Sequence, residues 1–400
     1  MSKNIFEKAT VFVLLCSGIL EIYAVGDYSL QFVLMVALIL LFFIIKSKST
    51  IPRPLFCYFL YFYFASLLNI RASSGIFDTF ILIPFLSYLL YYNIRDVDNF
   101  YTIYKTLAYI FIAFFFIQEL SYLATGVRIS GIIKSLPLAI TQDSNWLSEH
   151  DSSYRSTSFF SEPAHFAQFL LPLLVYELFG VKSSKRNILL ITAIAIVLVL
   201  LQSGNAILAS IPVALAYVLK IWSSRSVLQR IKLIIVVSLF LCVSSIYVAT
   251  TTGQELLSRS ETLTLEYTGY VTSAYMRIFR GWDLFSLMSI KQMIFGLGNR
   301  ETLSAFIQGS EISNRFINDA DIYLNGAQSI LIYTGFIGAI IFGWFFYSTW
   351  KKTNFTGKTI LSVLLVFMFM ASNFLGSSMA VCLVLANILT DFDSYDTRRI

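Results

Sequence analysis

Charged residues are scarce in this chain: Asp, Glu, Lys and Arg make up 13% of its 400 residues. Soluble domains carry about a quarter. Histidine occurs only twice and cysteine only four times, while 57% of the residues are hydrophobic and 16% are aromatic. So low a charge content excludes an ordinary soluble domain and indicates a membrane protein.

The few cysteines and the dispersed basic residues argue against further classes of protein, namely disulfide-linked, metal-binding and nucleic-acid-binding proteins. All four cysteines lie in apolar segments without metal-ligand spacing: Cys16, Cys57, Cys242 and Cys382. We therefore expect them to be small packing residues, with neither a disulfide nor a metal. The net charge is +6, but the basic residues lie apart in short loops and form no patch for nucleic acid.

Long apolar blocks dominate the chain, and a helix needs about 20 such residues to cross the hydrocarbon core of a bilayer. We predict an all-α integral membrane protein with about 12 transmembrane helices in a single polytopic domain, residues 1–400. The first block, after Lys3 and Lys8, is kept as a helix because it lacks a clear signal-peptide cleavage site. The expected spans lie near 10–25, 29–45, 54–70, 76–93, 102–123, 163–180, 187–203, 205–221, 232–250, 327–349, 358–373 and 376–391.

The distribution of Lys and Arg predicts the orientation. Placing the N-terminus in the cytoplasm puts 19 of the 29 Lys and Arg residues on the cytoplasmic side, as positively charged cytoplasmic loops require. An even number of spans then places the C-terminus in the cytoplasm as well.

Two of the loops expected outside are much longer than the others, at 125–162 and 251–326. Loops of more than about 15 residues are usually functional or disordered. These two contain many aromatic residues, which argues against disorder. We expect short amphipathic helices in them and the functional site on the extracytoplasmic side.

The stretch RSTSFFSEPAHFAQFLLPLL combines charge with a membrane helix. Pro163 favours a helix start, with Ser161 or Glu162 as its cap. Glu162 and His165 share one helical face at the outer surface, and Gln168 extends that face one turn deeper. A carboxylate beside an imidazole can act as a general base. Equally, Glu162 can be a plain helix cap that complements the helix dipole.

The second long loop contains Arg277 and Arg280 among aromatic residues. We expect an amphipathic helix here, lying at the membrane interface. Paired guanidinium groups suit a diphosphate, although they also suit phospholipid headgroups. Arg155, at the end of the first loop, is the third candidate for this diphosphate site. Gly296-Leu-Gly298 is interpreted as a turn between helices.

Asp319-Ala-Asp321 has the spacing with which many soluble glycosyltransferases hold a metal-bound nucleotide. It lies in a loop expected outside, where nucleotide sugars are absent, so we predict no metal.

Taken in order, these motifs resemble a known family. They are R-x4-F-x-E-P-x-x-F-A from Arg155, then LLQSGNAILA, then R-x2-R-x-W before IFGLGNR, and N-x9-G-x2-G from Asn325. This set is similar to the bacterial O-antigen polymerases of the Wzy type and the related O-antigen ligases. The resemblance covers roughly residues 155–345 and the number of spans.

The resemblance implies a multi-pass glycosyltransferase of the bacterial inner membrane that needs no metal or other cofactor. An undecaprenyl-diphosphate-linked glycan would be transferred to a sugar hydroxyl of another lipid-linked repeat unit on the outer face. Arg155, Arg277 and Arg280 would hold the diphosphate, and Glu162 or His165 would be the base, in a dry site lined by Phe159, Phe160 and Phe166. Tyr323, Asn325 and Trp282 are expected to contact substrate. A chain-length regulator (co-polymerase) and a flippase are possible partners.

One departure from the family concerns the ligases, which carry His-Asn before the span with Gly-x-x-Gly. Here Asn325 is present, but Leu324 stands at the histidine position. This favours a polymerase over a ligase-like transferase. A flippase or transporter is the third reading, and it is less favoured because no internal repeat is visible.

Overall fold

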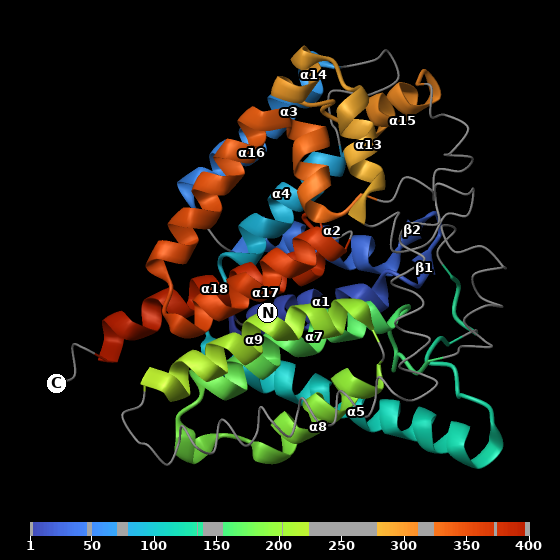
Figure 1. The fold of residues 1–400 in the computed structure, drawn as a ribbon, viewed down its shortest axis with the longest axis vertical. Coiled ribbons are helices and arrows are strands. Elements are labelled where there is room, and N and C mark those ends of the chain that lie inside the picture. Colours follow the sequence, from blue (N-terminus) through green and yellow to red (C-terminus); the bar gives the residue numbers. More distant parts are fainter. Residues whose placement is uncertain are drawn as a thin grey trace.

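The computed structural model describes residues 3–45, 50–69, 79–133, 135–138, 155–201, 203–223, 278–310, 324–371 and 374–396 (Figure 1). It is mostly helical. The long helices are α1 (Lys3–Leu20), α2 (Leu30–Ile45), α3 (Arg53–Leu68), α4 (Thr79–Tyr91), α5 (Val97–Thr125), α7 (Pro163–Val175), α8 (Ile188–Leu200), α9 (Gly204–Ser223), α16 (Gly326–Lys352), α17 (Phe355–Met370) and α18 (Ser377–Asp396). The short elements are β1 (Ala24–Val25), β2 (Tyr28–Ser29), a π-helical turn (Tyr176–Gly180), a 3-10 turn (Ser183–Lys185), α13 (Arg280–Leu287), α14 (Ile290–Phe295) and α15 (Arg300–Gln308).

The predicted helical class is confirmed. A described helix overlaps each expected span except that at 232–250, which lies outside the described residues. Two helices, α5 with 29 residues and α16 with 27, are long and apolar enough to cross a bilayer, and several shorter helices are apolar as well. The fold is thus compatible with a membrane protein, whereas the number of crossings and their orientation stay predictions.

Local sequence explains where α5 begins and ends. The Asp96 side chain accepts a hydrogen bond from the backbone N–H of Asn99 at 2.9 Å, which satisfies one of the free donors of the first turn. At the other end, Gly126 takes a left-handed conformation with φ 73° and donates its N–H to the Tyr122 carbonyl. Glycine adopts this conformation at little cost, so it ends the helix.

Hydrogen bonds near the helix ends show which of these ends lie together at the same end of the bundle. At one end of the molecule, Glu7 Oε1 of α1 accepts hydrogen bonds from the backbone N–H groups of Arg95 (2.7 Å) and Asp96 (2.8 Å), just before α5. Thr353, which follows α16, donates to the carbonyl of Ala386 in α18 at 2.9 Å. Glu7, Arg95, Asp96 and Thr353 all belong to segments that the charge distribution assigns to the cytoplasmic side.

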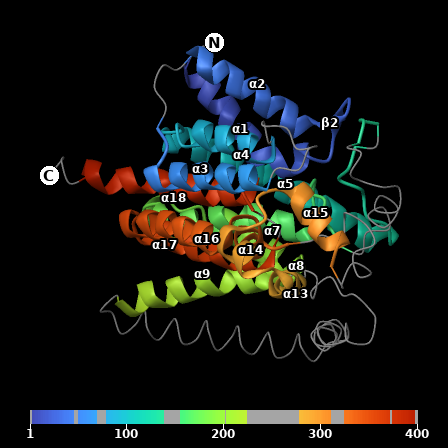
Figure 2. The same ribbon diagram turned by 90° about the horizontal axis from the view of Figure 1, so that it is seen from above.

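The opposite end joins residues expected outside. Strands β1 and β2 form a small antiparallel hairpin between α1 and α2. The first long loop packs on this hairpin, where the Ala24 N–H donates to the Pro137 carbonyl at 2.8 Å. The hairpin and α15 lie at the right of Figures 1 and 2, opposite the C-terminus. The helices therefore run back and forth between two ends of one bundle.

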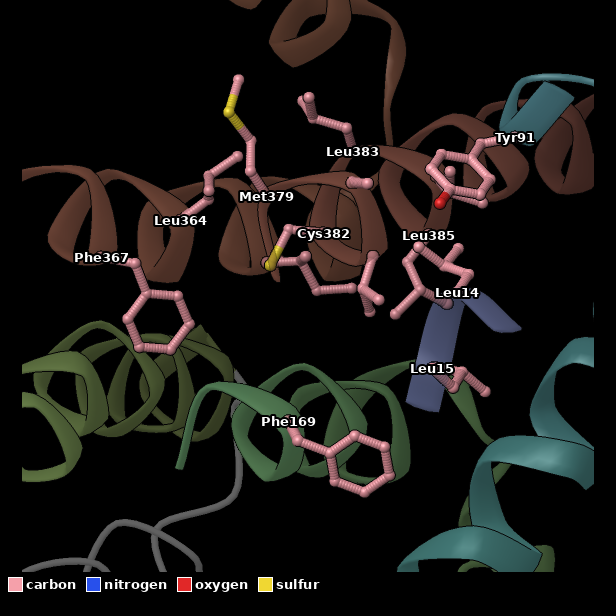
Figure 3. Close-up of a cluster of buried hydrophobic side chains, with 14 of the residues drawn as sticks. Leu14, Leu15, Tyr91, Phe169, Leu364, Phe367, Met379, Cys382, Leu383 and Leu385 are labelled. Carbon is pink, nitrogen blue, oxygen red and sulfur yellow. The ribbon is translucent and has the colours of Figure 1, made fainter. Parts of the chain in front are cut away.

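Helix α18 lies at the centre of this bundle. Figure 2 shows it between α1, α3 and α4 on one side and α7, α16 and α17 on the other. Its Met379, Cys382 and Leu383 are fully buried, and Figure 3 shows them among side chains of α1, α4, α7 and α17. Cys382 is thus a packing residue, as the sequence predicts, and burial of these apolar side chains fixes α18 against its neighbours.

Candidate functional site

Helix α7 begins as predicted, with Glu162 as its N-cap and Pro163 as its first residue. The backbone carbonyl of Glu162 accepts from the N–H groups of His165 (3.1 Å) and Phe166 (3.3 Å). Its carboxylate makes no capping hydrogen bond. The Glu162 side chain therefore does not cap the helix through a hydrogen bond, although the helix dipole still favours a negative charge at this position.

A strained turn at Ser158 sets the approach to α7. Ser158 has φ 56°, which is uncommon for a residue with a side chain. The Gln118 amide of α5 holds it from both sides, because Oε1 accepts from the Ser158 N–H at 2.8 Å and Nε2 donates to the Ser158 carbonyl at 3.2 Å. Ser158 Oγ also donates to the Phe111 carbonyl at 2.8 Å. Such strain persists only where the surroundings hold it, often next to a functional site.

Stacked aromatic side chains hold the residues that follow Ser158 in place. Phe160 stacks on Phe166 with ring centroids 5.2 Å apart, and both are almost fully buried. Phe159 stacks on Phe114 of α5 at 4.3 Å. Of the three phenylalanines expected to line the site, Phe160 lines the cavity described next, whereas Phe159 and Phe166 pack against neighbouring rings.

A cavity of about 250 Å³ opens where the end of α1 and the starts of α7 and α18 meet. His165 and Gln168 both line it, which confirms that they share one face. Glu162, by contrast, is not among the lining residues. The lining consists of Leu14, Leu15, Gly18, Glu21, Phe160, His165, Gln168, Phe169, Phe374, Gly376, Ser377, Ser378 and Val381.

The His165 ring is oriented by its neighbour. Ser161 Oγ lies 2.9 Å from Nδ1 of His165, within hydrogen-bond distance. When Nδ1 carries the proton and donates it to Ser161, the lone pair of Nε2 is left to accept a proton. The arrangement therefore suits a general base.

Gln168 is buried, with 4% of its surface exposed, yet its Nε2 has no hydrogen-bond partner among the described residues. A buried amide without a partner costs about 1–3 kcal/mol. Glu21, on the other side of the cavity, is exposed. The cavity thus combines a proton acceptor, a carboxylate and an unused amide.

The described part of the second long loop contains the short helices α13, α14 and α15, as expected. The amphipathic stretch is divided at Met288 and Ser289, between α13 and α14. After α13, Ser289 begins α14 with a capping box in which its side chain accepts from the Gln292 N–H. Helix α14 then ends at Gly296, and α15 begins after Asn299. The predicted turn at Gly296-Leu-Gly298 is confirmed.

Arg280 is the first residue of α13 and is 4% exposed. Its neighbour Gly281 lies so close to Gln328 of α16 that a Cβ there would be 2.4 Å from the Gln328 side chain. Gln328 also donates to the Ile278 carbonyl at 2.8 Å. The start of α13 is therefore fixed against the start of α16, and the guanidinium group is held in a buried setting.

Trp282, one residue beyond Gly281, lines a different and larger cavity of about 570 Å³. This second cavity is an open one, lined mainly by apolar side chains of α16 and α17, including Ile330, Phe342 and Met368. Neither Arg280 nor Trp282 lines the cavity of His165. Among the described residues, the structure therefore does not combine them with His165 in one pocket.

Asn325 caps α16. Its side chain accepts from the Gln328 N–H at 2.9 Å, and its Nδ2 donates to the Phe369 carbonyl of α17 at 3.0 Å. Gln328 Oε1 in turn accepts from the Asn325 N–H at 3.1 Å, which completes a capping box. The side chain thus holds two helices together, and its predicted contact with substrate stays a prediction.

The glycines that follow Asn325 in the motif have a physical explanation. Gly335 interrupts α16 with φ 61° and ψ −169°, a conformation that is essentially restricted to glycine. The α14–α15 turn packs into this interruption, where the N–H groups of Leu297 and Gly298 donate to the carbonyls of Ile332 (2.8 Å) and Tyr333 (2.9 Å). Gly338 also lacks room for a side chain, since a Cβ there would lie 2.1 Å from Thr334 Oγ1.

The remaining predicted site residues have no shared pocket in the described part of the chain. Arg277 and Tyr323 lie outside the described residues, as do Asp319 and Asp321. Arg155 is described and half-buried, and it precedes the buried Ser156 at the end of the first long loop.

Sequence reasoning missed Glu21, Ser377 and Ser378, which come from helices distant in sequence. A usable signal was present, because each lies at the extracytoplasmic end of an expected span. A list of the polar residues at those ends would include all three as candidates.

Together, the fold and the cavity define a helical protein, compatible with a membrane, that carries a polar pocket at one end of its bundle. No protein-family model matches the chain, and no curated protein matches it.

Proposed function

We propose that this chain is a polysaccharide repeat-unit polymerase of the bacterial inner membrane. It would transfer an undecaprenyl-diphosphate-linked glycan to a sugar hydroxyl of another lipid-linked repeat unit on the outer face. One observation carries the proposal. His165, from the motif that resembles the O-antigen polymerases, lines a cavity built from three helix ends that the charge distribution places outside.

The cavity residues suit the chemistry of this transfer. The acceptor hydroxyl oxygen attacks the anomeric carbon of the donor glycan, forming a new C–O bond. The bond from that carbon to the diphosphate oxygen breaks, and its electron pair leaves with the polyprenyl diphosphate. We assign the hydroxyl proton to Nε2 of His165, because His165 lines the cavity and its Nδ1 contacts Ser161. Glu162 is the alternative base.

Arginines would stabilise the leaving group. The diphosphate gains negative charge as the bond breaks, and a fixed guanidinium group stabilises that charge most where water is excluded. Arg280 is buried and attached to the start of α16 through its neighbours, so it meets this requirement. Arg155 and Arg277 are the further candidates for the same role.

The phenotype of a deletion strain distinguishes the proposal from its rivals. A polymerase mutant should display a single repeat unit on its core lipid. Loss of a ligase should instead leave no glycan on the core, with long lipid-linked chains accumulating. Loss of a flippase should trap single repeat units on the cytoplasmic lipid. Either of the last two results would overturn the proposal.

Complementation with variants tests the residues. Arg280→Ala should abolish long chains while Arg280→Lys retains some of them, since lysine keeps the charge but loses the planar fork. Arg300→Ala is the matched control, because Arg300 is an exposed arginine of the same loop, and it should support normal chain length. Normal chains from Arg280→Ala at wild-type protein level would refute the diphosphate role.

The base is tested in the same strain. His165→Ala should stop polymerisation, and we expect Glu162→Gln to have the smaller effect because Glu162 does not line the cavity. Loss of about 10²–10⁴-fold in rate is typical for removal of a general base. The reverse order of effects would move the assignment to Glu162.

A further inference from the structure

The cavity between α1, α7 and α18 has the chemistry of a sugar site. We infer that it binds one sugar ring of the acceptor repeat unit, held through hydrogen bonds from Gln168. This inference rests on the proposed function and deepens it, since it specifies which part of the substrate enters which cavity.

Gln168 is the first reason. Gln168 lines the cavity, and its Nε2 is buried without a hydrogen-bond partner among the described residues. A ligand that enters can satisfy this atom, and the cost of leaving it unpaired then disappears. A glutamine amide can also turn through 180°, which places its oxygen where its nitrogen was. A hydroxyl group fits both arrangements, because it donates and accepts.

The other polar groups narrow the ligand class. Glu21 provides a carboxylate that accepts hydrogen bonds, and Ser377 and Ser378 provide hydroxyl groups. In the described part of the chain, no Lys or Arg lines the cavity to neutralise a phosphate, so the diphosphate is expected elsewhere. A metal ion would need several oxygen or nitrogen ligands, and among the described residues no group of three or more His, Cys, Asp and Glu side chains is placed to hold one. A neutral ligand with several hydroxyl groups matches this set.

The apolar side of the cavity fits the same ligand. Phe160, Phe169 and Phe374 line it together with aliphatic side chains. A sugar ring has C–H groups that can pack on such rings and hydroxyl groups around its edge. The larger cavity at Trp282, by comparison, is lined almost entirely by apolar surface.

Size limits the ligand to a small part of the substrate. Pockets for drug-sized ligands measure about 300–1,000 Å³, whereas this cavity has a volume of about 250 Å³. A single sugar ring therefore fits the volume of this cavity better than an oligosaccharide does. Because His165 lines the same cavity, a hydroxyl group of the bound ring would lie within reach of the proposed base.

Binding of free sugars tests the inference directly. The purified full-length chain in a detergent without sugar headgroups is mixed with glucose, galactose, N-acetylglucosamine, N-acetylgalactosamine or rhamnose. Saturation-transfer NMR then reports which sugar contacts the protein. We expect a signal from at least one of them, and its loss in Gln168→Leu. Gln308→Leu, at an exposed position in α15, is the matched control and should bind as the wild type does.

Thermal stability separates a binding role from a structural one. Leucine removes an unpaired buried amide, so Gln168→Leu should melt at or above the temperature of the wild type while losing the sugar signal. If Gln168→Leu folds poorly, the Ser377→Ala/Ser378→Ala double variant decides, with a weakened sugar signal expected. A retained signal in the variant that folds, or no signal from any sugar with the wild type, would overturn the inference. Formation of long glycan chains tests the proposed function separately, and either result can fail without the other.

Discussion

Replacement of Gly335 by alanine should destabilise the protein through one defined contact. Gly335 has φ 61° and ψ −169°, and a Cβ at this position would lie 2.3 Å from the backbone oxygen of Ile294. Backbone atoms cannot move aside as a flexible side chain can. Either α16 must straighten or the α14–α15 turn must leave it.

The magnitude follows from two contributions. The backbone conformation costs a residue with a side chain about 1–3 kcal/mol, and the steric overlap costs a further ~1–3 kcal/mol. Small folded proteins have only about 5–15 kcal/mol of stability in total. We therefore expect Gly335→Ala to lose a large part of the stability of this chain.

Gly343→Ala is the control on the same helix, because a Cβ there meets no atom within 4 Å. Alanine inside a helix is favoured over glycine by about 1 kcal/mol, so this variant should melt at or slightly above the wild-type temperature. The assay is thermal unfolding of detergent-purified protein, followed by size-exclusion chromatography. Equal melting temperatures for Gly335→Ala and Gly343→Ala would refute the packing of the turn against α16.

Two further predictions concern polar contacts that position the site. Gln118→Ala removes both hydrogen bonds to Ser158 and leaves that buried backbone without partners, so the melting temperature should fall by the equivalent of about 1–3 kcal/mol; unchanged melting would show that the Ser158 turn is held by other contacts. Asn325→Ala removes the cap of α16 and the bond to Phe369, with an expected loss of about 0.5–2 kcal/mol. Asn325→Asp keeps the capping oxygen and should melt at a higher temperature than Asn325→Ala, whereas the same melting temperature for the two variants would argue against the cap.

The helical segments and the local structure of the motifs could be predicted from the sequence. Apolar blocks predicted the helical segments, and Pro163 after Glu162 predicted the start of α7, because these features depend on residues close together in the chain. Gly296-Leu-Gly298 was recognised as a turn for the same reason. Spacing of three residues likewise placed His165 and Gln168 on one face.

The composition of the cavity could not be predicted in the same way. Glu21 shares a cavity with His165 only because the end of α1 meets the starts of α7 and α18, and periodicity within one helix carries no information on that arrangement. The role of Gly335 was also invisible, since its conformation depends on a turn that arrives from α14. Asn325 resembled a substrate residue by motif, while the structure shows the contacts that make it a helix cap.

The most direct measurement is the reaction itself. The purified chain, in liposomes, is supplied with an undecaprenyl-diphosphate-linked repeat unit, and the products are separated by size and identified by mass spectrometry. We predict a ladder of glycans that differ by one repeat unit, with one undecaprenyl diphosphate released for each bond formed, and no ladder from His165→Ala. Unchanged single repeat units with the wild-type chain, or transfer only to an added core lipid, would contradict it.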